Sequence, residues 1–136
     1  MYRKIIVPVE MGQIEKGEKI LAKATTLLDT GGEIVLMSVV ESVPPYITIE
    51  LPMDFINQSV TEAETKLNAL NARHGGSARV KVVIGSPARE IMHLAEEEHA
   101  DLIIIGSHRP GLANYLIGST ADRVVRHATC SVLVDR

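Results

Sequence analysis

The feature that most constrains this chain is the alternation of short apolar runs with longer segments whose apolar residues recur at helical spacing. Residues 4–9 and 102–105 are apolar at almost every position, which is typical of strands buried on both faces of a parallel sheet. Between such runs, apolar residues recur every three or four positions, as on one face of a helix. This alternation predicts an α/β fold, a single doubly wound parallel sheet with helices on both faces.

Five strands and four helices follow from this pattern. Strands are expected at residues 4–9, 33–40, 79–84, 102–105 and 131–134, the first in the centre of the sheet and the third near an edge. Helices are expected at residues 14–29, 54–73, from 87 onward and 119–128. Gly31-Gly32 and Gly75-Gly76 are expected to end the first two helices, since glycine adopts the left-handed conformation common there. In the last helix, the residues expected to face inward are Ala121, Val124, Val125 and Ala128.

Length, charge and cysteine content limit the function classes. With 136 residues the chain fits one domain, spanning residues 1–136, and its net charge of −3 argues against a nucleic-acid partner. It contains no apolar stretch of the ~20 residues that cross a membrane, and its first apolar run is too short for a signal peptide. Cys130 is the single cysteine, so no internal disulfide can form and a reducing, cytoplasmic location is expected. Cys130 itself is expected to be a buried strand residue.

The candidate site is the long loop between Gly106 and Gly118, which leaves a buried strand and enters a helix at Ser119 and Thr120. Gly106 is expected to leave the strand at dihedral angles that other residues avoid, and Gly118 to let the chain approach a ligand closely. The first amides of the helix would then face an anion. The alternative is a plain helix start, with Ser119 as N-cap and Asp122 in a capping role.

The ends of other strands favour a ligand over the plain helix start. Open parallel sheets bind ligands beyond the carboxyl ends of their strands, and three segments lie at such ends. These segments are Pro8-Val9-Glu10, Val39-Val40-Glu41 and Gly106-Ser107. Their convergence favours a nucleotide.

Several familiar chemistries are not indicated. No lysine follows Gly118 as a Walker A loop requires, and no Gly-x-Gly-x-x-Gly or Gly-x-Ser-x-Gly motif is present. His93 and His99 lie on different helical faces, so a solvated charged face is expected there and no metal site. No catalytic residue is assigned, because Ser119 has no general base near it in sequence.

Nearly the whole chain resembles the universal stress protein family. The similar motifs are Val7-Pro8 at the end of the first strand, Gly85-Ser86-Pro87 before the third helix, the run from Asp101 to Ser107, and Arg126-His127-Ala128 followed by Ser131-Val132-Leu133-Val134. The resemblance implies the strand order 3-2-1-4-5. ATP-binding members carry Gly, two residues, Gly, nine residues and then Gly-Ser or Gly-Thr, and Gly106, Gly118 and Ser119 match this pattern.

Two departures from the family pattern concern binding. Arg109 stands at the second glycine and the following loop is one residue shorter, a form that resembles a bacterial branch with a Ser-His-Arg-Pro loop. Arg109 either donates to phosphate oxygens or is a solvated loop residue. Glu10 stands where the family has Asp, which keeps the acceptor chemistry but adds a methylene.

The resemblance implies where each part of a nucleotide would lie. Pro8 and Val9 would border adenine, Glu10 would face the nucleoside, and Val39 would offer its backbone to the base edge. The residues implied around ribose and phosphates are Gly106, Ser107, His108, Arg109, Gly118, Ser119 and Thr120.

The expected function is that of a stress-response protein which binds ATP or AMP, Mg²⁺ accompanying ATP, and turns over little or none of it. Two alternatives stay open, a dimeric interaction module with a vestigial pocket and a slow ATP hydrolase. A homodimer through residues 131–135 is expected, because an edge strand with unpaired backbone groups invites another strand. The other interpretation is that Asp135 and Arg136 protect the edge of a monomer.

Overall fold

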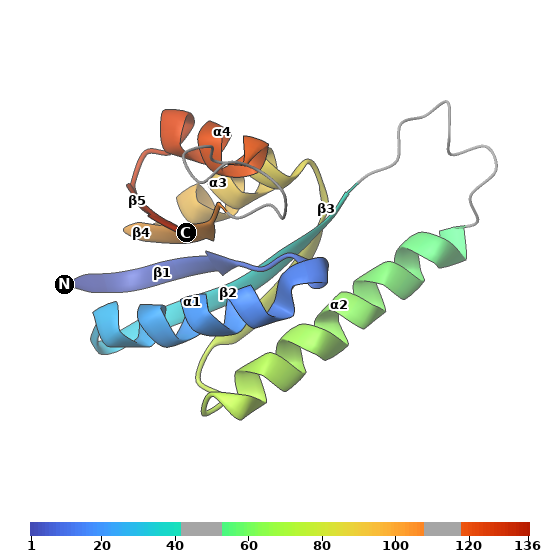
Figure 1. Ribbon diagram of the computed structural model, residues 1–136, viewed down its shortest axis with the longest axis horizontal. Helices are drawn as coiled ribbons and strands as arrows, with labels where there is room; N and C mark the ends of the chain where they lie inside the picture. Colours follow the sequence, from blue (N-terminus) through green and yellow to red (C-terminus); the bar gives the residue numbers. More distant parts are fainter. Residues whose placement is uncertain (42–52, 108–117) are drawn as a thin grey trace.

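The computed structural model describes residues 1–41, 53–107 and 118–136, and a five-stranded sheet forms their centre (Figure 1). The strands are β1 (Tyr2–Pro8), β2 (Leu28–Glu41), β3 (Arg79–Gly85), β4 (Leu102–Gly106) and β5 (Ser131–Asp135). All neighbouring strands are parallel, and their order is β3-β2-β1-β4-β5. The predicted fold class, strand order, central first strand and edge position of the third strand are therefore confirmed.

Four α-helices cover the two faces of this sheet. They are α1 (Ile14–Leu27), α2 (Met53–Arg73), α3 (Pro87–Glu97) and α4 (Ser119–His127), and a short 3-10 helix, η1 (Met11–Gln13), precedes α1. Helices α1 and α2 lie on one face, and α3 and α4 on the other (Figure 1). The crossovers are thus divided between both faces, as in a doubly wound sheet.

Strand β1 shows why consecutive apolar residues are needed at the centre. Ile5 and Val7 pack towards α1 and α2, whereas Ile6 packs towards α3 and α4, and all three are fully buried. Each such side chain contributes about 1.5–3 kcal/mol when it leaves water. A polar residue at any of these positions would therefore face one of two apolar layers.

The end of the first helix differs from the prediction. Helix α1 ends at Leu27 and β2 begins at Leu28, so Gly31 and Gly32 lie within a strand and do not cap the helix. Tyr2 pairs with Leu28 but Lys4 pairs with Glu33, so β2 contains extra residues at an irregularity in this pairing. Gly31 has a φ of +83°, and a Cβ on Gly32 would lie 2.8 Å from the Arg3 carbonyl oxygen. The two glycines thus serve this irregularity in the sheet.

The predicted end of the second helix is confirmed, whereas two predictions about buried side chains are wrong. Gly75 and Gly76 follow α2 with φ values of +95° and +71°, so the predicted stop is confirmed. The prediction for Val125 is wrong, because α4 buries one narrow stripe and leaves this side chain 46% exposed. Cys130 is partly buried in the turn before β5, and so it is not a buried strand residue.

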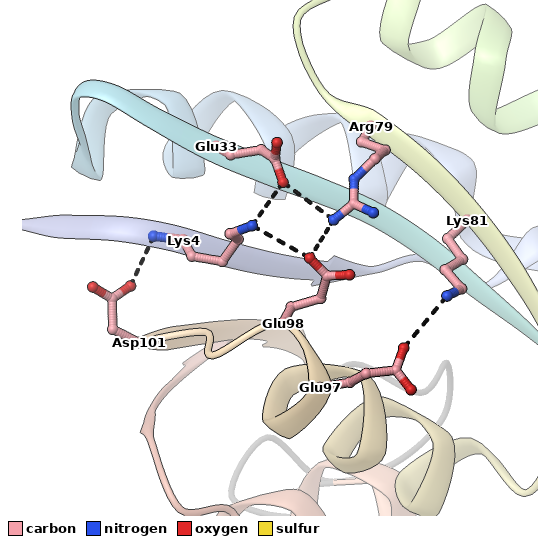
Figure 2. A network of polar contacts seen from close by, with 7 residues as sticks. All are labelled: Lys4, Glu33, Arg79, Lys81, Glu97, Glu98 and Asp101. Carbon is pink, nitrogen blue, oxygen red and sulfur yellow. Dashed lines mark hydrogen bonds and ion pairs between the residues drawn. The ribbon is translucent and has the colours of Figure 1, made fainter.

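A network of ion pairs joins four elements at the amino ends of the strands (Figure 2). The Lys4 ammonium lies 2.8 Å from a Glu33 carboxylate oxygen and 3.3 Å from one of Glu98, and Arg79 pairs with both carboxylates. The hydrogen bond from Arg79 is the main cause that lowers the pKa of Glu98, and the bond to Glu33 is the main cause that raises the pKa of Lys4. We call these four residues the amino-end network.

Candidate functional site

A pocket opens at the carboxyl ends of β1, β2 and β4, opposite the amino-end network. It encloses about 100 Å³ and is bounded by the start of α1, the start of α3 and the start of α4. Nine of the eleven predicted site residues line it: Pro8, Val9, Glu10, Val39, Gly106, Ser107, Gly118, Ser119 and Thr120. His108 and Arg109 lie outside the described residues. Segments more than a hundred residues apart in sequence therefore meet at one place.

The wall formed by β1 is fixed by close packing. The Val9 amide donates to the Met37 carbonyl oxygen over 2.8 Å, which holds the chain beside β2 after β1 has ended. The Val9 side chain is buried against Gly17 of α1, where an added Cβ would lie 2.6 Å from a Val9 methyl group. Glu10 follows as an exposed residue before η1, and its carbonyl accepts the amide of Gln13, the last residue of η1. A carboxylate at the pocket mouth thus stands on a well-anchored backbone.

The start of α4 supplies a second side of the pocket. Gly118 is the N-cap and Ser119 the first helical residue, so the expected alternative with Ser119 as N-cap is wrong. The Asp122 carboxylate accepts two hydrogen bonds from Arg126, at 3.0 and 3.1 Å, and the structure gives it no capping role. The first amides of an α-helix have no acceptor within the helix, and the helix dipole places partial positive charge there. Ser119 and Thr120 therefore present an anion-favouring end to the pocket.

The two glycines of the motif do not need unusual dihedral angles. Gly118 has φ −65° and ψ 157°, which any residue can adopt, and Gly106 is a regular strand residue paired with Asp135. The expectation for Gly106 is therefore wrong. An added Cβ at Gly106 would meet Ile20 and the Lys16 stem at 3.4 Å, an ordinary contact distance.

One side of the pocket, formed by α1 and by η1 before it, is not revealed by the sequence pattern. Gln13, Lys16, Gly17 and Ile20 all line it and recur at the i, i+3, i+4, i+7 spacing of one helical face. Ile20 is the only large apolar residue of the four, so the apolar spacing that predicts the helix passes over the polar members of the same face. Further lining residues that were missed are Ser38, Pro87, Ile91, Ile105 and Ala121.

A pair of lysines meets one carboxylate beside this pocket. Lys16 Nζ lies 2.9 Å from Asp135 Oδ2, and Lys23 pairs with Oδ1 of the same side chain. The hydrogen bond from Lys23 is the largest cause that lowers the pKa of Asp135, followed by that from Lys16. The Asp135 carbonyl accepts the Ser107 amide over 3.1 Å, so this residue also joins β5 to the pocket rim.

Residues 1–41, 53–107 and 118–136 contain no group of three His, Cys, Asp or Glu side chains placed to hold a metal ion. Within the same ranges, no helix has the length and apolar character needed to span a membrane.

Comparisons with known proteins point to one family. The family model described as the universal stress protein family matches residues 1–136. Universal stress protein G of Salmonella typhimurium is 34% identical over 142 residues, which cover 100% of both chains. The solved structure of a universal stress protein from Lactobacillus plantarum has a TM-score of 0.80 at 21% identity and covers 99% of this chain and 98% of that one.

Two other solved structures contain nucleotides. One is a universal stress protein in complex with cAMP, with a TM-score of 0.66 at 16% identity, covering 99% of this chain and 97% of that one. The other is the Archaeoglobus fulgidus universal stress protein in complex with dAMP, with a TM-score of 0.66 at 18% identity, covering 99% of this chain and 98% of that one.

Proposed function

Because this chain belongs to the universal stress protein family, we propose that it binds an adenine nucleotide, ATP or AMP, in the pocket at the carboxyl ends of β1, β2 and β4. The observation that carries the proposal is the meeting of three strand ends with the start of α4 around one cavity. A parallel sheet concentrates ligand-binding groups at this edge, and a helix start favours phosphate. The cAMP and dAMP complexes of related folds support an adenine nucleotide as the ligand class.

The two ends of the pocket suit the two ends of a nucleotide. Pro8, Val9 and Val39 offer apolar surface and strand backbone to the base, with Glu10 facing the nucleoside. The phosphates would lie at Gly118, Ser119 and Thr120, next to Gly106 and Ser107. His108 and Arg109 belong to the same proposal through the family motif, and Mg²⁺ would accompany ATP.

The proposed role is regulatory or protective, in the cytoplasm and in the response to stress. Slow ATP hydrolysis at most is expected, because Glu10 is the only carboxylate among the described lining residues and the proposal places it at the nucleoside, away from the terminal phosphate. Binding without rapid turnover lets the occupied state persist, as a regulator requires.

The proposal includes a homodimer through β5. This strand lies at the edge of the sheet, where one side of its backbone has no neighbouring strand among the described residues. Asp135 is turned back to the lysines of α1, so it is not a free charge that would repel a second strand. Two-fold pairing of β5 would satisfy the open backbone groups of both copies.

The experiment that tests the function is mass spectrometry of the denatured, freshly purified protein, followed by calorimetric titration of the nucleotide-free protein with ATP, AMP, cAMP and adenosine. Co-purified adenine nucleotide, or binding of ATP or AMP at micromolar concentration, is the expected result. A protein that carries none and binds none would be a dimeric interaction module with a vestigial pocket. Multiple-turnover release of phosphate from ATP would instead identify a hydrolase.

A further inference from the structure

Lys16 is the only cationic side chain among the described residues that line the pocket. It projects from the first turn of α1, and its aliphatic stem lies on the side of Gly106 where a Cβ would point, 3.4 Å from that position. Its side chain is 19% exposed. Most of the side chain is thus withdrawn from bulk water, beside the rim on which the phosphates of the proposed nucleotide would lie.

The partner of Lys16 does not require it. Asp135 is bound by two lysines, one to each carboxylate oxygen, so these three groups carry a net positive charge of one. If Lys16 turned to another anion, Lys23 would still neutralise Asp135. A buried carboxylate with one lysine would lose its only counter-charge in the same movement, and that would be costly.

The chemistry of lysine permits such sharing. An ammonium group has three donors, and the ion pair with Asp135 uses one of them. Its flexible four-carbon stem lets the charge move several ångströms without a change in the helix. The distance between Lys16 and a phosphate at Ser119 therefore does not have to be short before the ligand binds.

We propose that Lys16 is a specificity-determining residue of this pocket, which turns from Asp135 towards the phosphates of the ligand and selects charged nucleotides over uncharged nucleosides. This inference rests on the proposed nucleotide function. Lys23 remains paired with the Asp135 carboxylate while Lys16 binds the ligand. The sequence motif of the family does not contain this residue, since it lies on α1 and the motif lies between residues 106 and 119.

The test compares variants of Lys16 and of neighbouring charged residues by calorimetric titration with ATP, adenosine and inorganic tripolyphosphate. Lys16→Met keeps the stem and removes the charge, and it should weaken ATP about tenfold or more, the loss typical of one hydrogen bond to a charged group. Adenosine affinity should stay within about twofold. Lys16→Arg should restore most of the ATP affinity. Equal losses for ATP and adenosine, or no loss for ATP, would overturn the inference.

Lys19→Met is the matched control, because Lys19 is an exposed lysine of the same helix that does not line the pocket. Its ATP affinity should stay within about twofold of the wild type; a loss equal to that of Lys16→Met would assign the effect to the net charge of α1 and overturn the inference. Lys23→Met leaves Lys16 as the lysine partner of Asp135, so the turn of Lys16 to the ligand becomes costly and ATP affinity should fall. An ATP affinity unchanged from the wild type would contradict the sharing of Asp135 by the two lysines. Asp135→Asn removes the competing carboxylate and should tighten ATP. Weaker binding of ATP by Asp135→Asn would also count against Lys16 as a shared cation.

Tripolyphosphate separates this inference from the nucleotide function. Suppose that Lys16→Met weakens tripolyphosphate binding, and that the wild type binds ATP no more tightly than tripolyphosphate. Adenine recognition would then be refuted, and Lys16 would be retained as a residue that binds anions. If the wild type and Lys16→Met bind ATP equally tightly, the proposed role of Lys16 is refuted and the proposed nucleotide function is retained. Urea unfolding of each variant checks that the fold is intact.

Discussion

At the scale of single residues, the pocket depends on positions where small size matters more than chemistry. Gly17 permits α1 to lie directly against Val9, and Val9 forms part of the pocket wall. Gly118 lets the chain reach the start of α4 without a side chain in the cavity. Gly17 is a glycine for reasons of space, and Gly118 has an ordinary extended backbone conformation. Substitutions at these positions therefore separate packing from binding.

The first prediction concerns Gly17→Ala. The new methyl group would lie 2.6 Å from Val9 Cγ1, so α1 or the Val9 side chain must shift, and such overpacking costs about 1–3 kcal/mol. The higher helix propensity of alanine offsets up to about 1 kcal/mol of this cost. We expect a net loss of stability by urea unfolding, which Val9→Ala in the same chain should partly restore.

Gly12→Ala is the control for this prediction, because a Cβ there meets nothing within 4 Å. It should leave the unfolding midpoint almost unchanged. Additive effects of Gly17→Ala and Val9→Ala would contradict the proposed contact, since residues that touch should couple.

The second prediction concerns Gly118→Val. The backbone at Gly118 has φ −65° and ψ 157°, values suited to a β-branched residue, so the fold should persist. The added side chain would enter the proposed phosphate site, and we expect ATP and AMP affinity to fall at least tenfold in calorimetric titration. Unchanged affinity in a folded variant would place the phosphates elsewhere.

At the scale of elements, the two ends of the sheet are built differently. The carboxyl ends carry the pocket, whereas the amino ends carry the amino-end network, which ties β1, β2 and β3 to the end of α3 (Figure 2). Asp101 adds to this end by accepting the amides of Arg3 and Lys4 at 2.9 and 3.0 Å. Burial would raise the pKa of Asp101, but these hydrogen bonds outweigh it and the pKa is lowered. The contribution of these carboxylates to the free energy of unfolding therefore depends on pH.

The third prediction concerns Glu98→Gln. The folded pKa of Glu98 lies below its ordinary 4.5, so its contribution is present above pH 4.5 and is lost as the pH falls through the folded value. We expect the variant to be less stable than wild type by about 1 kcal/mol at pH 7, a modest value because Arg79 is half exposed. The difference should vanish in acid, measured by urea unfolding between pH 2 and pH 7.

Glu96→Gln is the control, since Glu96 is an exposed glutamate on the same helix and lies outside the network. Its free energy of unfolding should change with pH between pH 2 and pH 7 in the same way as that of the wild type. A stability difference for Glu98→Gln that is constant from pH 2 to pH 7 would show that charge plays no part.

At the scale of the whole molecule, the open question is how the β5 edge is covered. The Ser107 amide donates to the Asp135 carbonyl, so Asp135 faces β4 with its backbone groups. Backbone groups of successive strand residues point to opposite sides. Leu133 therefore also faces β4, and Val132 and Val134 turn their amides to the open edge. This assignment makes the proposed homodimer testable residue by residue.

The fourth prediction is that Val132→Pro or Val134→Pro gives a folded monomer, because proline removes an amide that faces the partner. Sedimentation analysis of the wild type at micromolar concentration should show a dimer. Leu133→Pro is the comparison variant, and it should destabilise the fold by interrupting pairing with β4. A wild type that sediments as a monomer would rule the dimer out.

The sequence by itself determined the elements and their class. Consecutive apolar residues such as Ile5, Ile6 and Val7 leave no polar face, so only a strand covered on both sides accommodates them, and the alternation with helical segments then specifies a parallel sheet. The strand-end rule also predicted Pro8, Val9, Glu10, Val39, Gly106 and Ser107, and the glycine before a helix start predicted Gly118, Ser119 and Thr120; all nine line the cavity. These results depend on local pattern and on connection rules, which a sequence carries directly.

The tertiary structure alone decided which residues meet across long distances. Gly31 and Gly32 looked like a helix stop, but the pairing of β2 with β1 uses them at an irregularity in the sheet. Val125 fits a helical stripe and yet stays exposed, because the sheet covers only part of α4. Lys16 and Asp135 are 119 positions apart, and no periodicity relates them. Their contact arises because α1 and the end of β5 pack on the same corner of the sheet, a relation that exists only after the chain has folded.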